Sequence, residues 1–187
     1  PDSTVSSADS GIATGVIKIN GQLIIILDFE KIVSDISPET GLKVSDIESL
    51  EGRERSSAHI ISVEDSPLLG AMISNSLKKS GYINLTRFSN GKEAWDYLQE
   101  VKNGGIQNDI ACVITDIEMP QMDGHRLTKL IKSDEYLKSI PVVIFSSLIN
   151  EQMRIKGESL GADAQLSKPE IGKLVSEIDR LLDRRAE

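Results

Sequence analysis

The sequence has a single cysteine, no long apolar run and no secretion signal, and each lack excludes a class of protein. Cys112 is the only cysteine, so a disulfide framework and a cysteine-rich zinc site are both excluded. The longest apolar run, residues 23–27, has the length of a strand, whereas a membrane-spanning helix needs about 20 residues. The N-terminus lacks a charged-then-apolar signal pattern, so we expect a cytoplasmic protein.

The charge balance is acidic, with a formal net charge of −8 over 187 residues. Five basic and 10 acidic residues precede Ala58, and 16 basic and 19 acidic residues follow from that position on. Nucleic-acid-binding domains carry clustered Lys and Arg, and neither part of this chain is basic. The composition therefore predicts no nucleic-acid partner.

The N-terminal part contains the pattern of a β-hairpin. Val16-Ile17-Lys18-Ile19 and the apolar run at residues 23–27 flank Asn20-Gly21, a pair that favours a tight two-residue turn. Apolar residues at helical spacing follow over 29–36, and residues 37–57 combine Pro, Gly and charges as a linker does. The chain begins with Pro1 rather than Met, so we expect a piece of a longer protein. The expected organisation is an N-terminal segment over 1–36, a linker over 37–57 and a main domain over 58–187.

From Ala58 onward, strand and helix patterns alternate. Strands are predicted at 58–63, 83–88, 110–115, 141–146 and 163–166, and helices at 67–79, 91–103, 124–132, 151–160 and 170–184. Five such β-α units predict an α/β fold with a parallel, doubly wound sheet.

Polar residues directly follow these strands, at the sheet edge where sites of open α/β folds lie. Glu64 and Asp65 follow the first strand, Asp116 the third, Ser146 ends the fourth, and Lys168 follows the fifth. Clustered carboxylates repel one another unless a cation lies among them, and oxygen ligands suit Mg²⁺. An aspartate can attack phosphorus to form an acyl phosphate. The sequence therefore predicts Asp116 as a phosphate acceptor, assisted by Mg²⁺, the charge of Lys168 and a hydrogen bond from Ser146.

Residues 58–187 resemble the receiver domain of two-component response regulators. The resemblance is carried by Glu64-Asp65, by the DIEMPQMDG run that starts at Asp116, by Ser146 and by Lys168-Pro169. It implies the flavodoxin-like strand order 2-1-3-4-5. It also implies a metal ligand from the main-chain carbonyl of Glu118 and a cis peptide bond before Pro169. One departure is Gln165, because receivers commonly carry an aromatic ring at this position.

The segment TGVIKINGQLIIILDFEKIVSDI resembles the closing part of a CheW-like coupling domain. A coupling segment before a receiver is the arrangement of the CheV family of chemotaxis proteins. That resemblance implies a phospho-accepting regulatory protein, not an enzyme acting on an external substrate, that assists its own phosphorylation and dephosphorylation. The implied partners are chemoreceptors and a CheA-like histidine kinase. The exposed edges of the hairpin also predict self-association.

Three other functions remain as alternatives. The first is a stand-alone receiver that acts as a phosphate sink or single-domain regulator. The second, a transcriptional regulator, would carry a basic DNA-binding domain. The third, an aspartyl-nucleophile hydrolase of the haloacid dehalogenase type, requires two acids one residue apart after the first strand, which Glu64-Asp65-Ser66 does not provide. His125 follows a turn and is expected to be exposed, with no partner for nucleophile–base chemistry.

Overall fold

The computed structural model describes residues 13–19, 22–27, 55–104, 109–147, 149–168 and 171–186. The chain divides into two compact units, Pro1–Gly41 and Leu42–Glu187, which are described separately. Among the described residues, no helix is long and apolar enough to cross a membrane.

The N-terminal unit contains the predicted hairpin. Strands β1 (Ala13–Ile19) and β2 (Gln22–Leu27) pair antiparallel, with Ile19 opposite Gln22 and Lys18 opposite Leu23. This register leaves two residues for the connection, the length expected for an Asn-Gly turn. The turn itself and the helix expected over 29–36 lie outside the described residues.

The second unit alternates strands and helices as predicted, with bounds that differ by at most two residues. Its strands are β3 (Ser56–Val63), β4 (Tyr82–Phe88), β5 (Ile110–Thr115), β6 (Val142–Ser146) and β7 (Ala164–Ser167). Its helices are α3 (Pro67–Lys79), α4 (Gly91–Lys102), α5 (Gly124–Ser133), α6 (Glu151–Ser159) and α7 (Ile171–Ala186).

All five strands run parallel in the order β4-β3-β5-β6-β7, which confirms the predicted order 2-1-3-4-5. The order reverses between β3 and β5, because β4 lies on one side of β3 and β5 lies on the other. In open α/β sheets the crevice at such a reversal is where ligands bind.

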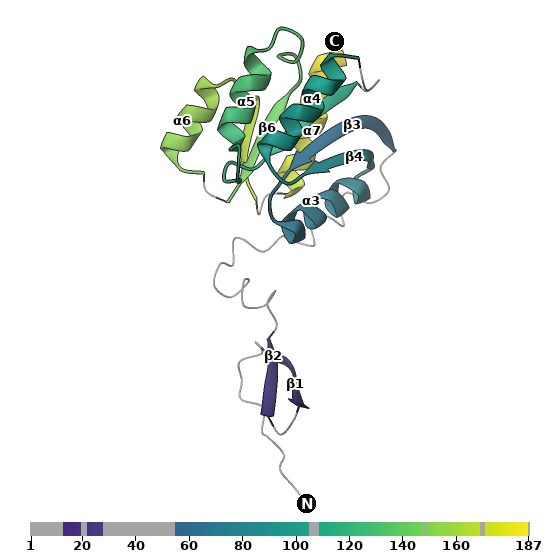
Figure 1. The fold of residues 1–187 in the computed structure, drawn as a ribbon. Coiled ribbons are helices and arrows are strands. Elements are labelled where there is room, and N and C mark those ends of the chain that lie inside the picture. The colour runs from purple at the N-terminus through teal and green to yellow at the C-terminus, as the bar shows by residue number, and fades with distance from the viewer. Residues whose placement is uncertain are drawn as a thin grey trace, which may run out of the picture. The chain divides into compact units, whose positions relative to one another are not determined.

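Helices cover both faces of this sheet (Figure 1), and apolar side chains pack between the helices and the strands. On one face, α3 and α7 pack against residues that include Ile60, Cys112 and Phe145, and the apolar stripe of α7, which includes Leu174 and Ile178, is buried here. On the other face, α4 and α5 pack against residues that include Ile61 and Val113. Burial on both faces explains why the central strands are nearly continuous apolar runs.

Candidate functional site

Three acids meet where β3 and β5 end. Glu64 and Asp65 follow β3, and Asp116 follows β5, its neighbour in the sheet. The amide of Asp116 donates to the carbonyl of Val63 (3.0 Å), so the pairing of the two strands continues to the acids. One carboxylate oxygen from each of the three lies within 4.8 Å of the others. Glu64 and Asp116 are buried, whereas Asp65 is exposed.

Lys168, at the end of β7, lies between two of these acids. Its Nζ is 2.6 Å from Oδ2 of Asp116 and 2.8 Å from Oε2 of Glu64. The lysine side chain is 11% exposed, so both ion pairs are largely shielded from solvent. The structure thus brings together four of the predicted site residues, which come from three separate strand ends.

Ser146 ends β6, the strand between β5 and β7, and is buried. It is the register partner of Ser167, and its carbonyl accepts a hydrogen bond from the amide of Lys168 (3.2 Å). Ser146 and Lys168 are therefore held at the same sheet edge by the pairing of β6 with β7.

The loop after Asp116 is packed closely against the acceptor. Oδ1 of Asp116 accepts a hydrogen bond from the amide of Ile117 (2.6 Å). A Cβ atom at Gly124 would lie 1.8 Å from the carbonyl oxygen of Asp116, so only glycine fits at this position. Asp123 caps α5 by accepting a hydrogen bond from the amide of Arg126 (2.8 Å).

Two expectations about this loop and its neighbour stay predictions. The side chain of Glu118 is exposed, and the metal contact expected from its main-chain carbonyl remains untested. Pro169, and with it the expected cis peptide bond, lies outside the described residues.

Burial and charge shift the ionisation of the site in definite directions. Burial raises the pKa of Glu64, the ion pair with Lys168 opposes that shift, and the negative charge of Asp116 adds to it. Burial alone would lower the pKa of Lys168, but its contacts with Asp116 and Glu64 outweigh burial and raise the pKa. The lysine is therefore a permanent cation at neutral pH, held next to the proposed acceptor.

The prediction that His125 is exposed is wrong. It is 4% exposed, because the first turn of α5 packs it against the N-terminal half of α6, where its ring has a hydrogen bond with the backbone of Met153. Burial and the nearby charge of Lys156 lower the pKa of His125, so the ring is neutral at pH 7. Helical spacing is the sequence feature that indicates this burial, because His125 and Thr128 lie three residues apart beside the buried stripe of α5.

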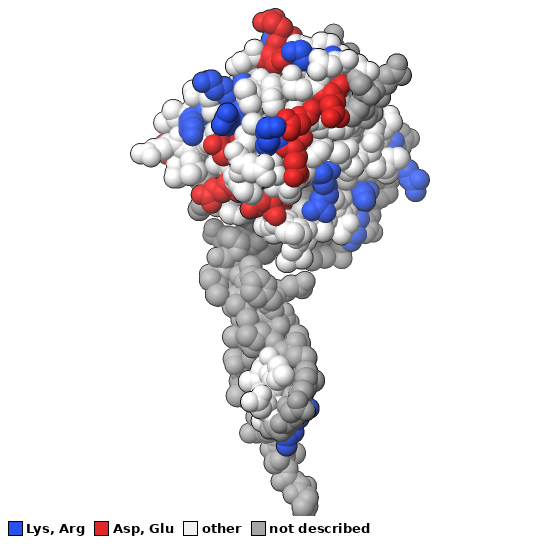
Figure 2. Space-filling model, viewed as in Figure 1, with Lys and Arg blue, Asp and Glu red and all other residues white. Residues whose placement is uncertain are grey.

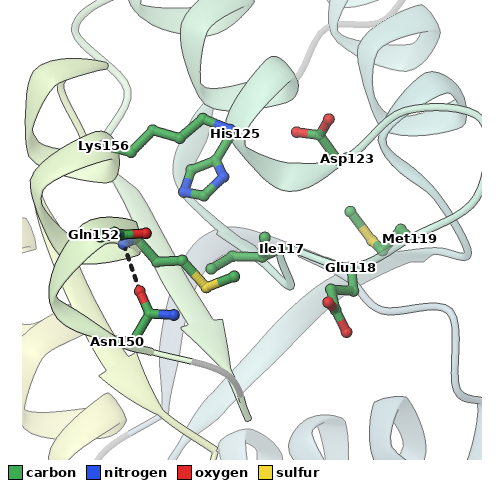
Figure 3. Close-up of a pocket in the computed structure, with 9 residues that line it drawn as sticks. Ile117, Glu118, Met119, Asp123, His125, Asn150, Gln152 and Lys156 are labelled. Carbon is green, nitrogen blue, oxygen red and sulfur yellow. Dashed lines mark hydrogen bonds between the residues drawn. The ribbon is translucent and has the colours of Figure 1, made fainter.

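A cavity of about 510 Å³ opens beside this histidine, between the loop after Asp116 and the start of α6 (Figure 3). Ile117 and Glu118 line it on the loop side, and Met153 and Lys156 line it on the α6 side. The cavity borders the residues that directly follow the proposed phosphate acceptor, so α6 is not packed tightly against that loop.

On the face shown in Figure 2, basic side chains lie in several separate places among acidic ones. This distribution agrees with the formal net charge of −8.

A family model described as the response regulator receiver domain matches residues 60–179. The chain belongs to this family. A solved structure with this fold, the signal receiver domain of a histidine kinase from Syntrophus aciditrophicus, is 29% identical, with a TM-score of 0.60, over 68% of this chain and 92% of that one. The Mn²⁺-bound response regulator Rcp1 is 26% identical, with a TM-score of 0.57, over 65% of this chain and 91% of that one.

Similarity to chemotaxis proteins extends beyond the receiver domain. The chain is 28% identical to the chemotaxis protein CheV3 of Helicobacter pylori, over 92% of this chain and 56% of that protein. It is 30% identical to CheV2 of the same organism, over 78% of this chain and 45% of that protein. The chain thus spans about half the length of these relatives, and the predicted CheV-like arrangement is confirmed.

Proposed function

We propose that this chain is a phospho-accepting component of chemotaxis signalling, in which Asp116 takes a phosphoryl group from a phosphohistidine of a CheA-like kinase. The observation that carries the proposal is the position of the Asp116 carboxylate, which lies beside two further acids and forms an ion pair with the Lys168 ammonium. In the transfer, a carboxylate oxygen of Asp116 bonds to phosphorus, the P–N bond breaks, and the imidazole leaves as the neutral base after gaining a proton.

The three acids fit a hard divalent cation. Their oxygens converge within 4.8 Å, and carboxylates this close repel one another unless a cation compensates them. Asp65, exposed and next to the buried pair, and Asp116 would be direct ligands of Mg²⁺, together with the main-chain carbonyl of Glu118. Glu64 would instead remain paired with Lys168 through its Oε2, while its Oε1 accepts a hydrogen bond from the amide of Ser66 (3.2 Å). Bound Mg²⁺ would neutralise charge on the transferring phosphoryl group. That the related Rcp1 is described in a Mn²⁺-bound form supports a metal here.

Lys168 and Ser146 would bind the phosphoryl oxygens of the phosphorylated Asp116. Lys168 is a cation within ion-pair distance of Asp116 and can follow the negative charge from carboxylate to phosphoryl oxygens. Ser146 lies at the same edge and can donate its hydroxyl proton to a phosphoryl oxygen. Both act by charge and positioning, the main requirements of phosphoryl transfer.

We also infer the cellular setting from the CheV relatives. A hairpin before a receiver, in a CheV-like arrangement, supports a role in coupling chemoreceptors to the kinase in the cytoplasm, with phosphorylation of Asp116 adjusting that coupling. The similarity to the sensor histidine kinase CheAY of Helicobacter pylori, 26% identical over 90% of this chain, supports the same setting. The chain would act as a regulatory phosphoprotein that assists its own phosphorylation and dephosphorylation.

Phosphorylation with acetyl phosphate tests the proposal without knowledge of the kinase. In Mg²⁺ buffer the wild type should gain one phosphoryl group, and EDTA should prevent the gain. Asp116→Asn should gain none, whereas Asp163→Asn, a control aspartate away from the site that pairs with Lys132, should behave as the wild type. Label on Asp116→Asn equal to that of the wild type would refute the assignment. A pull-down with receptor and kinase fragments then separates a coupling protein from a stand-alone phosphate sink.

A further inference from the structure

The sequence contains three Asn-Gly pairs, Asn20-Gly21, Asn90-Gly91 and Asn103-Gly104, and the last two lie in the described part of the chain. Asn-Gly is the dipeptide most prone to deamidation, because glycine has no side chain to hinder attack by its own amide nitrogen. That nitrogen bonds to the side-chain Cγ of the asparagine, and a folded chain allows the attack only where the pair can move. The fold therefore decides which of the two described pairs reacts.

Asn90-Gly91 is held firmly at the start of α4. Asn90 is 2% exposed, and its Oδ1 caps the helix by accepting a hydrogen bond from the amide of Glu93 (3.0 Å). The amide of Gly91 donates to the carbonyl of Met122 (3.1 Å), and a Cβ atom at Gly91 would lie 2.6 Å from that oxygen. Both groups that would react are therefore held by hydrogen bonds in a closely packed part of the protein.

Asn103-Gly104 lies at the opposite end of the same helix, where it is open to solvent. Asn103 is the C-cap residue of α4, and both members of the pair are exposed. The amide of Gly104 donates to the carbonyl of Val101 (3.0 Å) in the last turn, and a Cβ atom at Gly104 would meet nothing within 4 Å. Helix ends fray at little cost in free energy, so this amide is released without any opening of the core.

Neither pair can react in the backbone conformation of the folded protein. The succinimide ring joins the glycine nitrogen to Cγ of the asparagine, so ψ of the asparagine must bring these two atoms to the same side. The angle ψ is 6° at Asn103 and 163° at Asn90, and both values keep the nitrogen away from Cγ. The rate at each pair therefore follows local opening, which is frequent at the exposed end of α4 and rare at its buried start.

We propose that Asn103 is a site of spontaneous deamidation in the folded protein, with water as the co-reactant, and that the fold protects Asn90. The nitrogen of Gly104 loses its proton and attacks Cγ of Asn103, the C–N bond of the side-chain amide breaks, and ammonia leaves after gaining a proton. Water then opens the succinimide at either carbonyl and yields aspartate or isoaspartate. The net reaction consumes one water, releases one ammonia and leaves a carboxylate in place of a neutral amide.

The new carboxylate lies at an unfavourable position for α4. The C-terminus of a helix carries a partial negative charge, so an acid at this position weakens the last turn. The neighbouring residue Lys102 forms an ion pair with Asp134 (2.7 Å), the C-cap residue of α5, and the new charge competes for this lysine. Deamidation of Asn103 thus loosens the end of α4 and its link to the end of α5.

Peptide mass spectrometry of the full chain, incubated for several days in mildly alkaline buffer, tests the site. The protease used must leave the bond between Lys102 and Asn103 intact. Asn103 should deamidate at least about tenfold faster than Asn90, because opening at the buried pair is the rarer event. In guanidinium chloride, which unfolds the chain, the two pairs should react at similar rates.

Three results of that experiment would overturn the proposal. They are an unmodified Asn103, a rate at Asn90 that equals or exceeds the rate at Asn103 in the folded protein, and a difference between the pairs that persists in denaturant. The last result would show that the fold does not set the rates.

Amide hydrogen exchange measures the opening separately from the chemistry. The amide of Gly104 should exchange at least about tenfold faster than the amide of Gly91, and equal exchange would overturn the proposed opening. Asn103→Asp places the charge of the product in the chain and should speed exchange of the last turn of α4 about two- to fivefold. Asn103→Gln, which keeps a neutral amide, is the control and should leave exchange unchanged. Equal exchange in the two variants would overturn the loosening of α4.

Discussion

The ammonium group of Lys168 lies 2.6 Å from Oδ2 of Asp116, although 52 residues separate them in the chain. The same nitrogen is 2.8 Å from Oε2 of Glu64, so one cation pairs with both buried acids of the site. Because the two acids leave β3 and β5 while the lysine leaves β7, the contact depends on correct assembly of the whole sheet. It also places a positive charge where a phosphorylated aspartate would need one.

The two neighbouring acids should contribute unequally to metal binding. Asp65 is exposed beside the cluster, whereas Glu64 is engaged by Lys168 and by the amide of Ser66. We expect Asp65→Asn to weaken Mg²⁺ binding about tenfold or more and Glu64→Gln to weaken it less, since only the first removes a direct ligand. Calorimetric titration with Mg²⁺ measures both, and equal affinities would contradict this division of roles.

Glu64→Gln should stabilise the metal-free protein at neutral pH. Burial raises the pKa of Glu64 in the fold, so its ionised form is favoured less in the folded than in the unfolded state. The wild type therefore loses stability relative to the variant as the pH rises through the folded-state pKa, and the two should converge in acid, where Glu64 is protonated. Thermal unfolding in EDTA across this pH range checks the prediction, and a less stable variant at pH 7 would disprove it.

Gly124→Ala should disrupt both stability and phosphorylation. Its Cβ would lie 1.8 Å from the carbonyl oxygen of Asp116, and relief of this overlap must move the acceptor loop, at a cost of about 1–3 kcal/mol. Gly104→Ala is the matched control: Gly104 has φ +75° but open space around it, so the change costs about 1 kcal/mol and leaves the site intact. Denaturant unfolding and acetyl phosphate labelling measure the two effects, and normal labelling of Gly124→Ala would show that the loop is not constrained as described.

The sequence predicts the sheet and its polar edge well, for physical reasons that apply to particular residues. Apolar runs such as residues 110–114 have to be buried on both faces, which fixes a parallel sheet and makes Asp116 a strand-end residue. The parallel order then brings Glu64, Asp65 and Lys168 to the same edge. The environment of His125 and the contact between Gln165 and Arg154 were not predictable in this way, because both depend on how closely α6 lies to its neighbours.

The hairpin should promote self-association. Leu23, Ile24 and Ile25 of β2 are 71%, 43% and 58% exposed, and successive residues of a strand point to opposite faces, so both faces of β2 are apolar. Ile25→Lys should shift the chain towards monomer, whereas Gln22→Lys, which adds the same charge to an exposed polar position of β2, should not. Light scattering over a range of concentrations measures the shift, and a monomeric wild type would refute the prediction.

The central claim is that Asp116 itself carries the phosphoryl group, and borohydride trapping followed by peptide mass spectrometry tests it most directly. Borohydride reduces an acyl phosphate to an alcohol and so converts a phosphorylated aspartate into homoserine at its own position. After treatment with acetyl phosphate and Mg²⁺, the account predicts homoserine at position 116, with Asp65 and Asp123 unchanged. Homoserine at another aspartate, with position 116 intact, would contradict it.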